Sequence, residues 1–215
     1  MEQVLHFKLA YASFANYSPR GKMELSKKSQ AICYGLKNAN KTVIESIFKY
    51  IEPGSSILTS LAEFINPDVT LVPIPRSAPL VQGGLWPALI IAQAFKEKGL
   101  VKNILPCLER IKRVPKSSFA KPGERPSVSN HYSSFKVNNS LVSPIQIVLI
   151  DDVLTKGSTM YAASLRIKEV YPEAQIKAFA IIRTMGKQAD IEKKLFSVIA
   201  KTISKIILKS KIFYQ

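Results

Sequence analysis

Short apolar runs and helix-spaced apolar residues alternate through the middle of the chain. The runs at residues 69–74, 147–150 and 175–182 predict buried strands, because parallel strands covered on both faces read as continuous apolar segments. Apolar residues three and four positions apart predict helices at 41–51, at 86–95 and directly after the second of these strands. Strands that alternate with helices are typical of a parallel sheet. The pattern therefore predicts an α/β fold, a parallel β-sheet flanked by helices.

The two ends of the chain have different patterns. Residues 1–17 are rich in Phe, Tyr and Ala with mixed periodicity, which fits a strand or a helix, and residues 1–60 together look like a cover over a core at 61–190. Near the C-terminus, apolar residues share one helical face and most lysines lie elsewhere, which predicts a basic amphipathic helix within 191–215. We expect this helix to dock on the core of a single domain. Binding to a membrane surface or a nucleic acid is the alternative.

The chain is strongly basic. Its 215 residues include 31 Lys and Arg against 15 Asp and Glu, a formal net charge of +16. The electric field of such a charge raises the local concentration of polyanions. The charge alone does not show whether the polyanion is a small polyphosphate or a nucleic acid. Solvated surface lysines are the simpler explanation for any single cluster. Apolar residues make up 47% and charged residues 21%, which favours a folded globular protein over a disordered chain.

Cysteine and histidine are too few and too scattered for a metal site built on them. Cys33 and Cys107 form no Cys-x-x-Cys pair, and His6 and His131 are the only histidines. We expect the two thiols to be reduced and buried. The chain starts with an acid where a signal peptide has bases, and no apolar run is long enough to cross a bilayer, so we expect a cytoplasmic protein without a membrane span.

The most informative segment is residues 147–159, Ile-Val-Leu-Ile-Asp-Asp-Val-Leu-Thr-Lys-Gly-Ser-Thr. Asp151 and Asp152 follow the apolar strand, where ligands bind in open α/β sheets, and their acceptor-only carboxylates suit ribose hydroxyls or a hydrated Mg²⁺ ion. The polar loop 155–159 is expected to open a helix, whose N-terminus favours a phosphate, and Gly157 lets the backbone come close to it. The segment therefore predicts a sugar-phosphate site.

Two other interpretations of the acidic pair stay open. Receiver domains also begin with an apolar strand that ends in Asp-Asp, but they need a third Asp at the end of a later strand. The chain has only two further Asp residues, Asp68 and Asp190, and Asp190 lies in a polar stretch. The second alternative is a capped strand-to-helix turn in which Asp and Thr make only local hydrogen bonds. Two adjacent acids and a Thr-containing glycine turn exceed what such a cap needs.

Segment 147–159 resembles the phosphoribosyl diphosphate (PRPP) motif of type I phosphoribosyltransferases, which consists of an apolar strand, an acidic pair and then Thr-Thr-Gly-x-Thr. The resemblance implies that Asp151 and Asp152 are the catalytic pair, which holds the ribose 2'- and 3'-hydroxyls and a Mg²⁺ ion, the ion in part through water. Lys156 stands where the family has a second Thr, so an ammonium group replaces one hydroxyl ligand of the anion. The 5'-phosphate site implied by the resemblance consists of Thr155, Lys156, Gly157, Ser158 and Thr159.

The resemblance extends to other segments. Residues 72–75, Val-Pro-Ile-Pro, look like the Val-Pro-Val-Pro of the competence-protein F-like branch, which implies that Arg76 and Ser77 face the diphosphate; a plain turn is the alternative. The basic loop 109–126 corresponds in position to the flexible loop that closes over the diphosphate in this family. Residues 183–184 lie where the family places contacts to the acceptor.

Two features depart from the competence-protein F-like branch. Residues 83–87, Gly-Gly-Leu-Trp-Pro, replace its Arg-Gly-Phe-Asn-Gln-type segment, which puts in doubt the acceptor or diphosphate contacts of the missing Arg and Asn. The zinc-binding cysteines of its N-terminal region are also absent here. In addition, Thr155 stands where some purine-salvage relatives carry an Asp that assists the base, so a standard purine is not the expected acceptor.

The resemblance implies an α/β core with a small hood and a transferase that passes the phosphoribosyl group of PRPP to a nitrogen nucleophile with the help of Mg²⁺. The alternative is a non-catalytic module that senses PRPP or a ribonucleoside monophosphate and binds nucleic acid. A third hypothesis is that the chain is a structural protein that binds no ligand. The sequence leaves open whether the chain forms a homo-oligomer.

Overall fold

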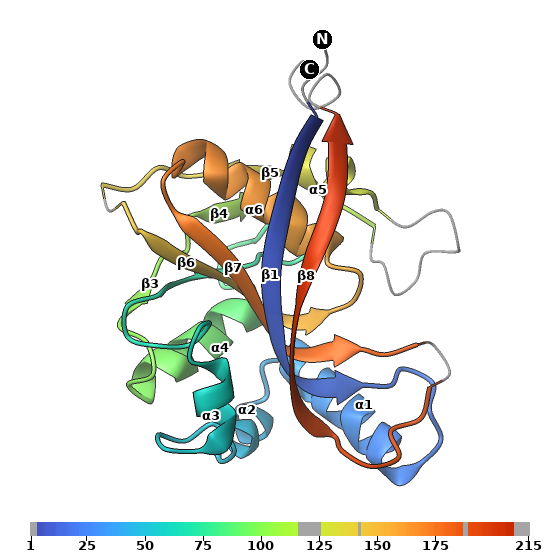
Figure 1. Cartoon of the computed structure of the whole chain (residues 1–215). Coiled ribbons are helices and arrows are strands. Elements are labelled where there is room, and N and C mark those ends of the chain that lie inside the picture. The colour runs from blue at the N-terminus through green and yellow to red at the C-terminus, as the bar shows by residue number, and fades with distance from the viewer. Residues whose placement is uncertain (1–3, 116–125, 142, 187–188, 209–215) are drawn as a thin grey trace.

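The computed structural model describes residues 4–115, 126–141, 143–186 and 189–208. Six strands in this part of the chain form one central sheet in the order β3-β2-β6-β7-β1-β8 (Figure 1). Neighbouring strands run parallel except for β8, which is antiparallel to β1. The predicted α/β class with a mostly parallel sheet is therefore confirmed. The strand bounds are Val4–Tyr17 for β1, Thr70–Pro73 for β2, Asn103–Ile104 for β3, Gln146–Leu154 for β6, Gln175–Thr184 for β7 and Phe196–Leu208 for β8.

Helices cover both faces of the sheet, with one hydrophobic core under each layer (Figure 1). The first layer consists of α1 (Glu24–Lys37), α2 (Lys41–Phe48), α3 (Ser56–Leu61) and α4 (Pro87–Glu97). The second layer consists of α5 (Val128–Ser133), α6 (Ser158–Val170) and a two-stranded antiparallel sheet of β4 (Leu108–Arg110) and β5 (Phe135–Val137).

Alternation of side chains along β6 explains the two cores. Val148 and Ile150 belong to the core under the first layer, whereas Ile147 and Leu149 belong to the core under the second. Consecutive side chains of a strand point to opposite faces, so a strand covered on both faces needs a continuous apolar run. This requirement is why the sequence pattern correctly located β6, and β2 and β7 beside it.

The helices predicted from apolar spacing are also present. The helix expected at 41–51 is α2, the one expected at 86–95 is α4, and α6 follows β6 as predicted. Asn40 caps α2, since its side-chain oxygen accepts a hydrogen bond of 3.1 Å from the Val43 N–H. Pro87 begins α4 at a position where its missing N–H costs nothing.

The C-terminal helix predicted within 191–215 is wrong, because the strand β8 occupies this region. Ile199 and Ile203 are four residues apart, and this spacing places two side chains on one face of a helix and equally on one face of a strand. Val198 and both isoleucines are β-branched and favour strands, and β1 supplies the hydrogen-bonding partner for the whole segment. Residues 209–215 lie outside the described residues.

The N-terminal region 1–60 is only in part a cover. β1 lies inside the main sheet between β7 and β8, so the mixed pattern at the start of the chain is a strand. Its pairing with β8 begins at Val4, opposite Leu208, whereas its pairing with β7 begins only at Tyr11. The first half of β1 and the second half of β8 therefore form a ribbon that extends beyond the sheet (Figure 1). The helices α1 to α3 do cover one face, as expected.

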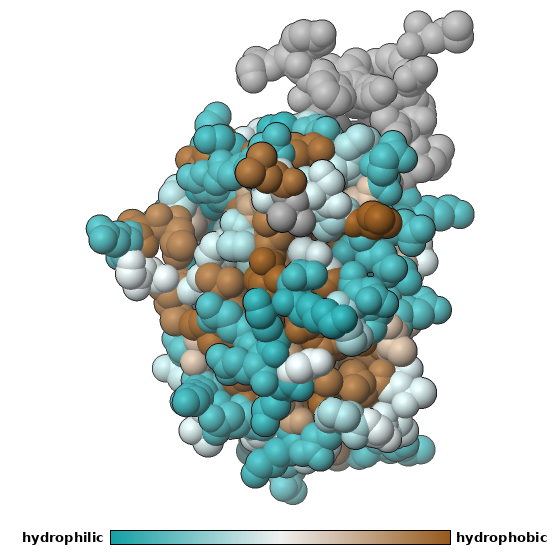
Figure 2. Space-filling model, turned by 90° about the vertical axis from the view of Figure 1, so that its left-hand side faces the viewer, coloured by the Kyte–Doolittle hydropathy of each residue, from teal (hydrophilic) through white to brown (hydrophobic). Residues whose placement is uncertain are grey.

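The surface on the β3 side of the sheet is mostly hydrophilic, with hydrophobic residues interspersed (Figure 2). Exposed large apolar side chains on the described part of the chain include Leu141 and Ile145, which precede β6. Isolated residues of this kind are ordinary on folded proteins. Within the described residues, no helix has the length and apolar character needed to cross a membrane.

A polar cluster fixes the start of α1 to the segment before β8. Asp190 accepts hydrogen bonds from the Met23 N–H at 3.0 Å and from the Ser26 hydroxyl at 2.8 Å. These donors lower the pKa of Asp190, the Met23 N–H first. Gly21 lies within the cluster, where an added Cβ would be 2.4 Å from the Ser18 Oγ and 2.5 Å from an Asp190 carboxylate oxygen. The residue at position 21 must therefore be very small.

Replacing Gly21 by Ala is expected to lower the free energy of unfolding by about 1–3 kcal/mol, the usual cost of forcing extra volume into a packed site. Urea denaturation followed by circular dichroism would measure the loss. Gly186→Ala is the matched control, because among the described residues, its chain neighbours apart, the nearest atom to its added Cβ is 3.8 Å away, and its effect should stay within about 0.5 kcal/mol. Equal stability of the two variants would contradict a packed cluster at Gly21.

Candidate functional site

The acidic pair lies within the last part of β6 rather than after it, because the strand continues to Leu154. The predicted strand end at residue 150 was therefore too early. Adjacent strand residues point to opposite faces, and the electrostatic partners of the pair agree with this. Asp151 interacts with Arg110 of β4 in the second layer, and Asp152 interacts with Cys33 of α1 in the first layer. The pair thus connects both layers at the carboxyl end of the sheet.

Short hydrogen bonds orient the two carboxylates. The Asp152 N–H donates to Asp151 Oδ1 at 2.9 Å, and the Val153 N–H donates to Asp152 Oδ1 at 2.8 Å. Each side chain is thereby held by the backbone of the residue that follows it. Carboxylates fixed in this way are suited to bind ligand hydroxyls without a large loss of side-chain entropy.

The Asp151 carboxyl group has an unusual environment. The residue keeps part of its surface exposed, but its carboxyl group is enclosed by protein. Burial raises the pKa of Asp151 well above its ordinary value of 3.8, the charge of Asp152 raises it further, and Arg110 opposes both effects. Two acids that repel each other in a buried position are stabilised when a cation comes near them.

The residues present fit a hydrated Mg²⁺ ion rather than a metal held by protein alone. The described part of the chain contains no group of three His, Cys, Asp or Glu side chains that could enclose a metal ion. Mg²⁺ usually keeps several waters and takes one or two carboxylates together with substrate oxygens. Asp151 and Asp152 can supply those carboxylates.

The loop between β6 and α6 has the shape expected of a phosphate site. Gly157 is the N-cap of α6 with φ of 72°, a left-handed conformation that glycine adopts at little cost. Thr155 and Lys156 are exposed, while Ser158 and Thr159 in the first helical turn are half-buried. The five predicted phosphate ligands therefore surround one helix N-terminus, where the backbone favours an anion.

The predicted diphosphate loop leaves the sheet at the same edge. β2 and β6 are parallel neighbours, and the Ile74 N–H donates to the Ile150 carbonyl at 2.9 Å. Arg76 directly follows this junction and is exposed, with Nη1 3.4 Å from the Leu85 carbonyl, and the Ser77 carbonyl accepts a hydrogen bond of 2.7 Å from Val114. The structure thus brings Arg76 and Ser77 to the edge that carries the acidic pair.

The predicted basic loop 109–126 is in part a strand. Arg110 ends β4 and is buried, while residues 116–125 lie outside the described residues. The described flanks of the loop and α5 enclose a pocket of about 340 Å³. Among the described residues that line this pocket, none is acidic and two are basic. The lining residues are Lys112, Arg113, Val114, Pro115, Pro126, Asn130, Ser133 and Ser134.

Three residues near the site were missed by the sequence reasoning. They are Arg110, Ser134 and His131, which connect the loop after β2 with the loop 155–159. The His131 Nε2 is 3.4 Å from the Thr159 hydroxyl. The one available signal was the alternation in β4, where Leu108 and Arg110 point inward and the residue between them is exposed. A charged residue at an inward position of a strand is uncommon and points to a special role.

The rim next to the acidic pair holds polar atoms that lack partners. β7 and β1 end side by side there, with Arg183 opposite Asn16. Within the described residues, the buried Asn16 Oδ1, Arg183 Nε and Thr184 Oγ1 make no hydrogen bond. Buried polar atoms without partners are rare and costly, so these atoms suit contacts to polar groups of a ligand. The acceptor contact that the resemblance implies for residues 183–184 stays a prediction.

No protein-family model matches this chain, and no curated protein matches it. The resemblance to type I phosphoribosyltransferases therefore depends on the motif residues, and the geometry of β6, the loop 155–159 and α6 is compatible with it.

Proposed function

We propose that the protein is a phosphoribosyltransferase of type I fold, which uses PRPP and Mg²⁺ to transfer a phosphoribosyl group to a nitrogen nucleophile. The observation that carries the proposal is the run from β6 to α6. An acidic pair lies near the end of a buried parallel strand, and Gly157 in a left-handed conformation then precedes a helix of 13 residues. This order puts carboxylates suited to ribose next to a helix N-terminus suited to a phosphate. In this proposal α1 serves as the hood.

The reaction would depend mainly on electrostatic stabilisation. Asp151 and Asp152 hold the ribose hydroxyls and favour the positive charge that develops on the sugar as the bond to the diphosphate loosens. Arg76 stabilises the charge on the departing diphosphate. A bound Mg²⁺ ion would neutralise part of the same charge and orient the diphosphate. The unpaired polar atoms of the β1 and β7 ends would contact the acceptor.

A second candidate is a non-catalytic module that senses PRPP or a ribonucleoside monophosphate and binds nucleic acid. The net charge of +16 favours this function, because it attracts polyanions over a wide surface. The exposed Lys156 in the phosphate loop adds a cation where the motif normally has a neutral hydroxyl. Both candidates use the same ribose-phosphate site, so ligand binding alone does not separate them.

A turnover assay distinguishes the transferase from the sensing module. The protein would be incubated with PRPP, Mg²⁺ and a panel of nucleobases, ammonia and amines, and diphosphate release would be measured. We expect release with one acceptor class, and we expect Asp152→Asn to abolish it. PRPP binding without release, together with nucleic-acid binding that weakens steeply with salt, would support the sensing module instead. Absence of calorimetric heat with both PRPP and a ribonucleoside monophosphate would contradict both functions.

A further inference from the structure

Arg110 is a buried cation beneath the candidate site. Its side chain is 1% exposed, and its guanidinium carbon lies 3.8 Å from the centre of the Phe135 ring. Burial lowers its pKa to about 10, and Asp151 opposes this shift, so Arg110 stays protonated at neutral pH. It forms no ion pair with any carboxylate in the described ranges. A buried charge without a direct counter-ion is costly unless hydrogen bonds compensate it.

The hydrogen bonds of Arg110 connect the two loops of the site. Its Nε donates to the Arg76 carbonyl at 3.0 Å, and its Nη1 donates to the Ser134 hydroxyl. The Ser134 hydroxyl donates in turn to the His131 carbonyl at 2.6 Å. The His131 ring then lies 3.4 Å from the Thr159 hydroxyl. One chain of contacts therefore runs from the proposed diphosphate loop to the proposed 5'-phosphate loop.

The backbone near Arg110 reinforces this connection. The Val114 N–H donates to the Ser77 carbonyl at 2.7 Å, and the Ile111 N–H donates to the Ser134 carbonyl at 2.9 Å. In the 76–77 loop, the Arg76 carbonyl is thus bonded from the last residue of β4, and the Ser77 carbonyl is bonded from the segment that follows this strand. With its carbonyls turned toward Arg110 and Val114, the exposed side of this loop is left for a ligand.

We propose that Arg110 is a positioning residue, which fixes the loop Arg76–Ser77 in the conformation that receives the diphosphate of PRPP. Arg110 holds the loop through its hydrogen bond to the Arg76 carbonyl and does not touch the substrate. The positive charge of Arg110 would also stabilise the negative charge of the bound diphosphate. This inference rests on the proposed function, because it assigns a role within the same PRPP site.

The test compares two ligands that differ only in the diphosphate. Calorimetry with Mg²⁺ would measure the affinity of PRPP and of ribose 5-phosphate for the wild type, Arg110→Met and Arg110→Lys. We expect Arg110→Met to lower PRPP affinity about ten-fold or more, the typical effect of a lost hydrogen bond to a charged group, and to leave ribose 5-phosphate affinity within about two-fold. Arg110→Lys keeps the charge but offers one nitrogen in place of the planar group that bonds Arg76 through Nε and Ser134 through Nη1, so most of the PRPP loss should remain.

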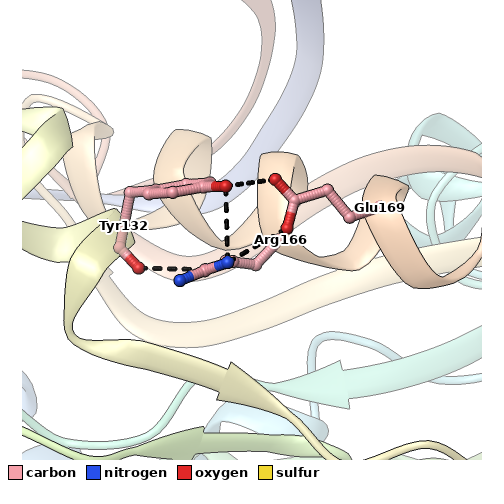
Figure 3. A network of polar contacts seen from close by, with 3 residues as sticks. All are labelled: Tyr132, Arg166 and Glu169. Carbon is pink, nitrogen blue, oxygen red and sulfur yellow. Dashed lines mark hydrogen bonds and ion pairs between the residues drawn. The ribbon is translucent and has the colours of Figure 1, made fainter. Parts of the chain in front are cut away.

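Arg166 supplies a matched control. Its guanidinium lies 4.0 Å from the centre of the Tyr132 ring, and it bonds the Tyr132 carbonyl at 3.2 Å and Glu169 at 3.1 Å (Figure 3). Arg166→Met thus removes a similar stacked cation from the same layer without touching the loop Arg76–Ser77, and both affinities should stay unchanged. Should Arg110→Met fail to fold, Ser134→Ala removes one partner of Arg110 and should weaken PRPP selectively.

Three outcomes would overturn the inference. Wild-type PRPP affinity in Arg110→Met would show that the loop does not need Arg110. An equal loss for both ligands would show a general structural role. Full rescue by Arg110→Lys would show that charge alone matters. Failure of the proposed function itself is seen separately, because the wild type would then bind neither ligand.

Discussion

Replacing Gly157 by Ala is expected to lower the free energy of unfolding by about 2–5 kcal/mol and to weaken binding of ribose 5-phosphate at least ten-fold. The left-handed φ of 72° costs a residue with a Cβ about 1–2 kcal/mol. The added Cβ would also lie 2.2 Å from Ile203 Cδ1 of β8, an overlap that costs about 1–3 kcal/mol to relieve. The Ile203 side chain and the loop must separate to relieve it, and a shift of the loop displaces the proposed phosphate site. Urea denaturation and calorimetry would measure the two effects.

Two further variants separate the causes. Gly99 has almost the same φ, 70°, and apart from its chain neighbours no described residue has an atom within 4 Å of an added Cβ, so Gly99→Ala should lose only the conformational part, about 1–2 kcal/mol. The double variant Gly157→Ala with Ile203→Ala removes the overlap and should be less destabilised than the sum of the two single variants. Strict additivity would show that β8 does not press on the phosphate loop.

The close packing of Ile203 against Gly157 shows what the sequence could and could not predict. The segment 147–159 predicted the strand, the loop and the helix, because its signals are local: an apolar run, a glycine and a helical stripe. The packing of β8 against this loop is a contact between segments far apart in the chain. Nothing in 147–159 indicates it, and the mistaken helix within 191–215 concealed it.

The error at β8 has a general physical cause. A spacing of four residues satisfies both the helical period and the strand period, so Ile199 and Ile203 could not decide between them. β-branched residues favoured a strand, but only weakly, since β-propensity depends on the partners that surround the strand. The partner was β1, whose own pattern was mixed, and the two ambiguous segments form a regular pair only in each other's presence.

Arg110 shows the same limit for the candidate site. The sequence marked 109–126 as basic but could not tell which base matters, because side-chain roles there depend on partners from other elements. In the structure Arg110 alone of the described basic residues in this stretch is buried, and its partners come from the β2 loop and from the end of α5. The acidic pair and the phosphate loop were predictable because they are adjacent in the chain, whereas the residues that support them are not.

Replacing Asp151 by Asn is expected to stabilise the ligand-free protein and to abolish Mg²⁺-dependent PRPP binding. In the folded state burial and Asp152 raise the pKa of Asp151 well above 3.8, whereas in the unfolded chain it returns to that value. Between these two pKa values the folded state holds a proton that the unfolded state has released, so stability falls as pH rises through this window and is then constant. Asn carries no such charge. At pH 8 the variant should therefore have a higher free energy of unfolding and a higher Tm than the wild type.

The pH dependence distinguishes this cause from a general effect of lost charge. Near pH 4 the Asp151 carboxyl is protonated in the folded state, so wild type and Asp151→Asn should unfold at nearly the same temperature, and the difference should grow as pH rises. Asp68→Asn makes the same change in net charge at an exposed site after α3 and should show no such trend. Mg²⁺ with PRPP should raise the Tm of the wild type and leave that of Asp151→Asn unchanged, because binding stabilises only a protein that retains its site. A variant less stable than wild type at pH 8 would contradict this account. It would mean that the charged Asp151 stabilises the ligand-free fold, whereas we expect its charge to destabilise the fold until a cation binds.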